Sequence, residues 1–191
     1  MRPITGRAEL ELFCQLPYVL NSELADDLES GRRRPEWMWL ALRGDRLVAR
    51  LAWWRRRQDG PPVLLDVLDL DEATDEKGRV GIAAALLRTA MAKVLPVAAR
   101  PPAYTRFVPP GWRDDAVARR AIEARMTALE LTAARLFVER LRLEWLAGTL
   151  LAAHDVPRIV ASTDLGNVPM ARAFERTGYL TFGHQIDMTW T

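Results

Sequence analysis

The sequence contains one cysteine and two histidines, and these low counts exclude two kinds of site. Cys14 has no second cysteine in the chain to pair with, so an internal disulfide is excluded. His154 and His184 are too few for a histidine-rich metal site. We therefore expect a fold that is held together by its hydrophobic core, with Cys14 packed as a core residue.

Long apolar runs are also missing. No stretch approaches the roughly 20 residues that a helix needs to cross a bilayer, and residues 1–5 lack the apolar segment of a signal peptide. We expect a cytoplasmic protein with no membrane partner. The chain has 191 residues, 49% of them hydrophobic and 27% charged, which is typical of one globular domain, or one domain plus a fragment.

Lysine is nearly absent, since only Lys77 and Lys93 among the 27 basic residues are lysine and the others are arginine. Two arginine triplets, at residues 32–34 and 55–57, could bind phosphates. The net charge is only +2, however, because acidic residues nearly balance the basic ones. Solvated turns explain the triplets better, and we do not expect a nucleic acid partner.

The first half of the chain predicts helices, a hairpin, a buried strand and a long helix. Residues 9–30 have a helical pattern that is broken at Pro17. Residues 37–42 and 47–54 are apolar strands joined by a turn that contains Gly44, which is typical of a β-hairpin. Residues 63–70 are almost continuously apolar and predict a central strand, and the Ala- and Leu-rich residues 78–94 predict a helix.

The end of the chain predicts a strand, a capped helix and a final strand. Residues 158–163 are apolar and β-branched. Asn167 is a good N-cap, Pro169 stands in the first turn, and Gly178 is suited to the left-handed position that ends a helix. Residues 179–190 then alternate in polarity, as in a strand.

The middle of the chain contains an internal repeat of this ending. Residues 101–112 predict an irregular segment or an edge strand, followed by a helix over 114–132 and an alternating strand over 135–145. Residues 128–133 align with residues 173–178, at an offset of 173 − 128 = 45, and the same offset places Phe137 on Phe182 and Trp145 on Trp190. These identities favour a duplication.

The terminal segment resembles a known family. Asn167, Pro169, Met170-Ala171, Phe174 and Gly178-Tyr179 resemble the last third of the GCN5-related N-acetyltransferases (GNAT), whose pattern is N-x-P-A-x-x-x-Y-x-x-x-G-F. One departure from this pattern matters for the chemistry. The family's tyrosine, often the general acid for the departing coenzyme A thiolate, falls on Phe174, which has no hydroxyl.

The resemblance implies a fold and a reaction. The fold would be an α/β (α+β) structure, with a twisted, mixed and mostly antiparallel sheet and helices on both faces. The reaction would be direct transfer of an acyl group from acetyl-CoA to a small-molecule amine. Arg79, Gly81 and Ala83 would hold the pyrophosphate and Asn167 the coenzyme A arm. Gly81 and Ala83 fit the end of the family motif R/Q-x-x-G-x-G/A, but Gly78 stands where Arg or Gln belongs.

Direct transfer requires a base that deprotonates the amine. Asp66 and Asp69 on the expected central strand, Glu139 and Asp164 are the candidates, and we select Asp164 and Glu139 as the catalytic pair. Asp164 is preferred because it ends a strand, where α/β proteins build sites. Each carboxylate is also explained as an ordinary solvated or capping group.

The repeat divides the chain into residues 1–148, a GNAT-like domain, and residues 149–191, the ending of a second repeat that packs on the first. The chain thus resembles a tandem GNAT protein from which most of the second domain is missing, with a deletion near residues 146–157. Two functions follow: an acetyl-CoA-dependent acetyltransferase, or an inactive remnant that serves as a structural or binding module. The exposed edge of an incomplete domain would favour a homodimer.

Overall fold

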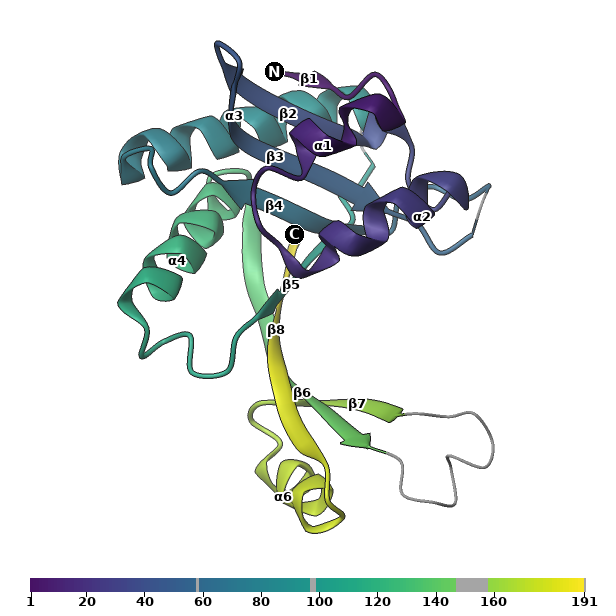
Figure 1. Cartoon of the computed structure of the whole chain (residues 1–191). Helices are drawn as coiled ribbons and strands as arrows, with labels where there is room; N and C mark the ends of the chain where they lie inside the picture. Colours follow the sequence, from purple (N-terminus) through teal and green to yellow (C-terminus); the bar gives the residue numbers. More distant parts are fainter. Residues whose placement is uncertain (58, 97–98, 147–157, 191) are drawn as a thin grey trace.

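The protein contains one continuous twisted sheet with a projecting arm (Figure 1). The computed structural model describes residues 1–57, 59–96, 99–146 and 158–190. Within these residues eight strands are ordered β1-β2-β3-β4-β5-β8-β6-β7, and every neighbouring pair is antiparallel except β4 and β5. The expected fold class, a mixed and mostly antiparallel sheet with helices, is confirmed.

The strands differ greatly in length. They are β1 (Arg2–Pro3), β2 (Met38–Arg43), β3 (Arg46–Trp54), β4 (Leu64–Leu70), β5 (Ala103–Val108), β6 (Ala134–Leu146), β7 (Arg158–Asp164) and β8 (Leu180–Trp190). Gly44, with a φ of 61°, makes the turn between β2 and β3. The predicted hairpin and central strand are therefore present.

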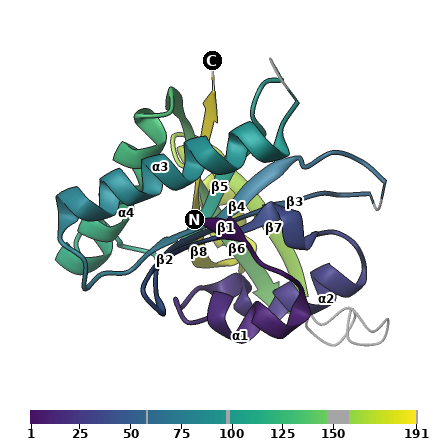
Figure 2. The same cartoon turned by 90° about the horizontal axis from the view of Figure 1, so that it is seen from above.

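Helices cover both faces of the sheet (Figure 2). One face has η1 (Arg7–Glu9), α1 (Leu10–Phe13), η2 (Val19–Glu23) and α2 (Leu24–Glu29), and the other has α3 (Glu76–Val94) and α4 (Ala116–Glu130). The remaining helices are η3 (Pro35–Trp37), which precedes β2, and α6 (Val168–Arg176), which lies between β7 and β8 in the sequence. The helix expected over 9–30 is thus divided into short pieces around Pro17. None of the described helices is long and apolar enough to cross a membrane.

Two hydrophobic cores lie on the two faces of the sheet. The larger core includes Trp53 and Leu65 from the strands and Leu86 and Leu87 from α3. The smaller core packs residues such as Phe13 against the opposite face. Because β2, β3 and β4 contribute to both cores, their sequences are almost continuously apolar.

β5 lies inside the sheet, between β4 and β8. The prediction of an irregular segment or an edge strand over residues 101–112 is therefore wrong for this strand. The prolines at 101, 102, 109 and 110 flank the strand and do not interrupt it. Its main-chain N–H groups can therefore bond to a neighbour on each side, which a proline within the strand would have prevented.

The long strands β6 and β8 form the arm, a name used here for the ends of these strands together with β7 and α6 (Figure 1). The terminal strand does not extend the edge of the sheet, because β8 inserts between β5 and β6, and β7 is the outer strand on that side. Apart from Leu146, the expected deletion point, residues 146–157, lies outside the described residues.

The pairing of β6 with β8 is symmetric. Arg140 lies opposite Gln185, and 185 − 140 = 45 is the offset of the sequence repeat. Pairs on one side of this centre are reproduced on the other: Glu139↔Ile186 by Leu141↔His184, Val138↔Asp187 by Arg142↔Gly183, Leu136↔Met188 by Leu143↔Thr181, and Arg135↔Thr189 by Glu144↔Leu180. The two irregularities in the ladder, at residues 137 and 182, are also related by the offset.

The outer strands follow the same symmetry. β5 pairs with β8 and β7 pairs with β6, so each half-repeat pairs its first strand with the second strand of the other half. Any regular antiparallel ladder reproduces its pairs in this way, so the informative feature is the position of the two irregularities, which the offset of 45 relates. The arrangement also makes β7 the counterpart of β5.

Gly44, which has a left-handed φ, and Gly81, which lies within a helix, together provide a test of the fold. Gly44→Ala should lower the free energy of unfolding by about 1–2 kcal/mol, because its left-handed φ is strained for a residue with a Cβ. Gly81→Ala should raise it by about 0.5–1 kcal/mol, because Gly81 lies within α3 with open space around it. Urea unfolding of both variants measures the difference, and equal effects would contradict the turn and helix assignments.

Candidate functional site

Ligand sites in open α/β sheets lie beyond the carboxyl ends of the strands, where the strand order changes direction. In this sheet that position is between β4 and β5, the only parallel pair among the described strands. Their ladder contains two pairs, Leu64↔Ala103 and Leu65↔Tyr104. Beyond Tyr104 the two strands no longer pair with each other, so the space between their carboxyl ends is the first candidate site.

A buried ion cluster occupies this space. The carboxylate of Asp69 contacts Arg50 (Nη2 to Oδ2, 2.8 Å), Arg106 (Nη2 to Oδ1, 3.0 Å) and Arg125 (Nη2 to Oδ1, 3.5 Å). Asp69 is only 1% exposed, and all three arginines are buried. Side chains from β3, β4, β5 and α4 thus converge on one carboxylate.

The arginines of the cluster also form hydrogen bonds with the main chain of β4. The carbonyl oxygen of Leu68 accepts a hydrogen bond from Arg106 Nη1 (3.3 Å) and another from Arg125 Nε (2.9 Å). The Arg106 guanidinium lies over the ring of Tyr18, 4.1 Å from its centroid. The Tyr18 hydroxyl in turn accepts a bond from the Phe107 N–H (3.1 Å). The opening between β4 and β5 is therefore filled from both faces of the sheet.

Arg50 connects the cluster to the N-terminal segment. Its Nη1 donates to the carbonyl of Phe13 (2.6 Å) and its Nη2 to Oδ1 of Asn21 (2.7 Å). The guanidinium also lies over the Phe13 ring. Asn21 in turn bridges Arg50 and the carbonyls of Cys14 and Leu16.

Burial and charge compete in setting the pKa values of the cluster. Burial raises the pKa of Asp69, but the charges of Arg106, Arg50 and Arg125 outweigh it and hold that pKa below its ordinary value. Burial, aided by the charge of Arg106, lowers the pKa of Arg125 to about 10. One carboxylate therefore faces three guanidinium groups. A carboxylate held ionised in this way is a poor proton acceptor.

Asp66, the other acid of β4, belongs to a second buried ion pair. Arg33 binds it with two hydrogen bonds (Nη1 to Oδ1, 2.7 Å; Nη2 to Oδ2, 2.6 Å) and also contacts Asp27. Burial nevertheless raises the pKa of Asp66 above its ordinary value. The group lines a hollow of about 370 Å³ together with Thr105 and Phe107.

A carboxylate of the chain itself, that of Asp75, caps the N-terminus of α3. Oδ1 of Asp75 accepts a hydrogen bond from the Gly78 N–H (2.9 Å), and the Asp75 carbonyl accepts from the Arg79 N–H (2.9 Å). A Cβ on Gly78 would lie 2.8 Å from Asp75 Oδ2, which accounts for glycine where the family motif has Arg or Gln. Since this carboxylate uses the helix N-terminus, the turn does not fit a pyrophosphate.

The other predicted coenzyme A residues are separated. α3 begins at Glu76, so the amides of Gly81 and Ala83 lie beyond its first turn, and Ala83 is fully buried. The Nε of Arg79 is buried and has no hydrogen-bond partner in the described part of the chain. Asn167 lies in the arm, at the other end of the molecule from α3 (Figure 1), where its Oδ1 accepts a bond from the Met170 N–H (3.3 Å) as an N-cap.

The predicted catalytic residues Asp164 and Glu139 also lie on strands of the arm. Asp164 ends β7, is exposed, and accepts a hydrogen bond from the Gly166 N–H (3.0 Å). The main chain of Glu139 on β6 lies opposite Ile186. Phe174, at the position of the family's tyrosine, contacts Tyr179 with 5.0 Å between ring centroids. Asp164 and Phe174 thus lie in the arm, apart from α3, whereas the main chain of Glu139 is in the same row of paired residues as Arg106 of the Asp69 cluster, because Ile186 pairs with both.

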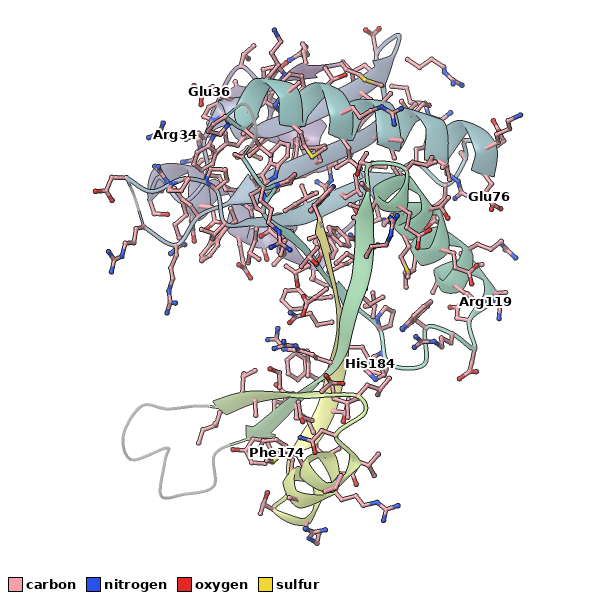
Figure 3. All side chains as sticks on the ribbon, turned by 180° about the vertical axis from the view of Figure 1, so that it is seen from behind. Arg34, Glu36, Glu76, Arg119, Phe174 and His184 are labelled. Atoms are coloured by element: carbon pink, nitrogen blue, oxygen red, sulfur yellow. The ribbon has the colours of Figure 1, made fainter. Side chains whose placement is uncertain are left out.

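Two surface hollows were not foreseen from the sequence. The larger, about 530 Å³, lies where the arm joins the body, near His184 (Figure 3), and is lined by Leu20, Phe107, Val160 and Phe182 among others. Arg142 also lines this hollow, and its guanidinium lies 4.6 Å from the ring centroid of Phe107 and 5.4 Å from that of Phe182. We call this hollow the joint groove. Strands far apart in sequence form it, so no local motif marks it.

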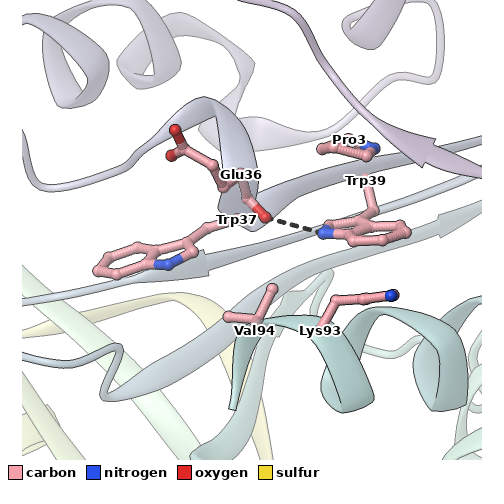
Figure 4. Close-up of a pocket in the computed structure, with 6 residues that line it drawn as sticks. All are labelled: Pro3, Glu36, Trp37, Trp39, Lys93 and Val94. Carbon is pink, nitrogen blue, oxygen red and sulfur yellow. Dashed lines mark hydrogen bonds between the residues drawn. The ribbon is translucent and has the colours of Figure 1, made fainter. Parts of the chain in front are cut away.

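The second hollow, about 410 Å³, lies beside the end of α3 (Figure 4). Trp37 and Trp39 form its wall, and Trp39 Nε1 donates to the carbonyl of Glu36 (2.8 Å). Lys93 is the basic residue that lines it. Among the residues that the structure describes, no group of three or more His, Cys, Asp or Glu side chains could hold a metal ion.

Comparison with known proteins adds no relative. No family model, no curated protein and no solved structure matches the chain. The resemblance to the GNAT family therefore depends on the residues of the terminal segment alone.

The Asp69 cluster predicts a large effect of one neutral substitution. Asp69→Asn should lower the free energy of unfolding by about 3–5 kcal/mol, because it leaves buried guanidinium groups without a counter-charge. Asp164→Asn, which changes an exposed carboxylate, should stay within about 0.5 kcal/mol of the parent. Chemical denaturation of both variants compares them, and a small effect at Asp69 would show that the cluster is solvated.

The tyrosines beside the cluster predict an unusual alkaline titration. Burial raises the pKa of Tyr18 and of Tyr104 above the ordinary value of 10.0, and the Tyr104 hydroxyl has no hydrogen-bond partner among the described residues. The folded state thus keeps these protons when the unfolded state loses them. Their contribution to stability is complete below pH 10.0 and is lost as the pH rises further.

Ultraviolet titration of the phenols measures this directly. Tyr18→Phe and Tyr104→Phe should leave the absorbance change of the folded protein near pH 10.0 unaltered, since neither group ionises there. A loss of amplitude near that pH in either variant would show that the site is open to water.

Proposed function

We propose that this chain is a GNAT-like protein that does not transfer acetyl groups and serves instead as a binding module. The observation that carries the proposal is the filling of the space between β4 and β5 by Arg106 and Arg125, both bonded to Leu68 and Asp69.

The chemistry of acetyl transfer explains why this filling matters. An amine attacks the thioester while backbone amides polarise its carbonyl, so the thioester must lie against exposed main chain. Here Arg106 and Arg125 lie against this part of the main chain of β4, since both donate hydrogen bonds to the carbonyl of Leu68. To admit an acyl chain, the arginines would have to leave Asp69, at a cost of about 3–5 kcal/mol. That cost corresponds to a loss of roughly 10²- to 10³-fold or more in affinity.

Two further observations support the proposal. The Asp75 carboxylate caps the N-terminus of α3 through the Gly78 N–H, where a pyrophosphate would have to bind. Phe174 has no proton to give to a thiolate. The rival function, acetyl-CoA-dependent transfer to a small-molecule amine with Asp164 or Glu139 as base, is favoured by the Asn167-x-Pro169 motif, but that motif lies in the arm.

The joint groove is the binding surface that the proposal offers. Its volume of about 530 Å³ lies within the range of small-molecule sites. The walls are mostly apolar, and Glu23, Arg142 and His184 are polar groups at hand to orient a ligand. We propose a cytoplasmic protein whose ligand has an apolar body and a polar end, and we do not propose a nucleic acid partner.

Thermal unfolding with increasing acetyl-CoA tests the proposal. A ligand present at 100 times its Kd stabilises a folded protein by about 2.7 kcal/mol, which corresponds to roughly 5–11 °C for a chain of this size. We expect no change in midpoint at millimolar acetyl-CoA. A rise that Arg79→Ala or Asn167→Ala reduces would contradict the proposal and would instead support the cofactor site that the resemblance implies.

A further inference from the structure

Exposed apolar side chains gather in the arm. Among the described residues twelve large hydrophobic side chains are exposed, and seven of them belong to the 158–190 segment: Ile159, Val160, Leu165, Val168, Met170, Leu180 and Phe182. Scattered exposed apolar residues need no explanation, but a concentration in so short a segment is typical of an interface.

The internal symmetry allows this surface to be compared with its counterpart in the first half-repeat, which other elements of the molecule cover. In the first half-repeat β4 lies beyond β5, and α4 packs against α3, β4 and β6. At the offset of 45, Arg125 of α4 corresponds to Met170 of α6. Arg125 is 6% exposed, against Asp69 of β4, whereas Met170 is 46% exposed. The second half-repeat has an apolar residue at this position, and no described element covers it.

We propose that a second copy of this chain covers the arm, through antiparallel pairing of the β7 edges of the two copies. The sheet has two outer strands among its described residues. β1 is two residues long and includes Pro3, so it offers little to pair with. β7 is seven residues long and has no described strand beyond it. Such an edge has a row of main-chain donors and acceptors ready for another strand.

The sequence of β7 is complementary to itself in the antiparallel direction. The strand reads RIVASTD, with Arg158 at its start, Asp164 at its end and Ala161 at its centre. Antiparallel pairing about Ala161 places Arg158 of one copy opposite Asp164 of the other, twice in the dimer. Parallel pairing would place like charges side by side. Opposite charges across a ladder are favourable and like charges are not.

The same register joins the exposed apolar residues of β7 to partners of suitable shape. Ile159 faces Thr163 of the other copy, and Val160 faces Ser162 of the other copy. Pairing about a two-fold axis uses the same surface on both copies, so it closes at a dimer. Because Val160 also lines the joint groove, the second copy would lie next to that groove. The inference does not depend on the proposed function.

The mass of the full chain in solution tests the dimer. Sedimentation equilibrium at micromolar to hundreds of micromolar concentration should give twice the chain mass of 21.6 kDa. Val160→Lys should weaken the dimer roughly tenfold or more, because it places a charge in the paired edge. Val63→Lys is the matched control, since Val63 is 43% exposed and Val160 42%, and it should leave the dimer intact.

A charge exchange tests the register. Arg158→Asp and Asp164→Arg should each weaken the dimer, because each creates two pairs of like charges across the axis. The double variant restores opposite charges and should recover the dimer. It keeps both local changes, including the loss of the Asp164 bond to Gly166, so a merely local destabilisation cannot produce this recovery.

Three outcomes would overturn the inference. The first is a monomeric parent chain at the highest concentration. The second is a dimer that Val160→Lys leaves as strong as Val63→Lys does. The third is a double charge variant no better than the single ones, which would show that the two β7 strands do not meet in this register. Circular dichroism of each variant confirms that it is folded.

Discussion

The Asp69 carboxylate, buried against three guanidinium groups, is the interaction on which the arrangement of the sheet depends. It joins Arg50 of β3, Arg106 of β5 and Arg125 of α4 at one point on β4. Through Arg50 it also holds the carbonyl of Phe13 and thus the N-terminal face. Buried charges are costly unless each is paired and hydrogen-bonded, so these elements are constrained to keep their positions together.

The cluster also fills the place in the fold where the chemistry implied by the family resemblance would occur. A sheet whose parallel strands diverge offers a natural place for an extended ligand, and in this chain side chains fill that place. Fold alone does not imply function, because function depends on the groups at the site. Here the site residues named by the family motif are divided between α3 and the arm, and the space between β4 and β5 contains arginines instead of exposed main chain.

Features with local causes could be predicted from the sequence. The left-handed Gly44 marks the hairpin, and Asn167, Pro169 and Gly178 mark the limits of α6, because turns and caps depend on a few neighbouring residues. The repeat offset of 45 was visible in identities such as Phe137 and Phe182, and it also relates the two irregularities in the ladder of β6 and β8.

Features that depend on distant partners could not be predicted. The place of β8 between β5 and β6 follows from pairings across the whole second half of the chain. Asp69 meets arginines that lie 19, 37 and 56 residues away in the sequence, and no spacing rule connects them. Asp164 was preferred because it ends a strand, but the sequence does not reveal that this strand lies in the arm, away from the body.

The arm connects the proposed duplication to the proposed dimer. The first half-repeat completes its sheet with β4, whereas the second ends at β7 with apolar residues exposed around it. A strand edge and apolar side chains that no described element covers give two copies a physical reason to associate.

A crystal structure of the protein grown with excess acetyl-CoA would show whether the space between β4 and β5 stays filled by side chains. We predict that Arg106 and Arg125 remain bonded to the carbonyl of Leu68 and to Asp69, with no ligand between β4 and β5. An acyl chain lying along β4 with the two arginines displaced would contradict the account.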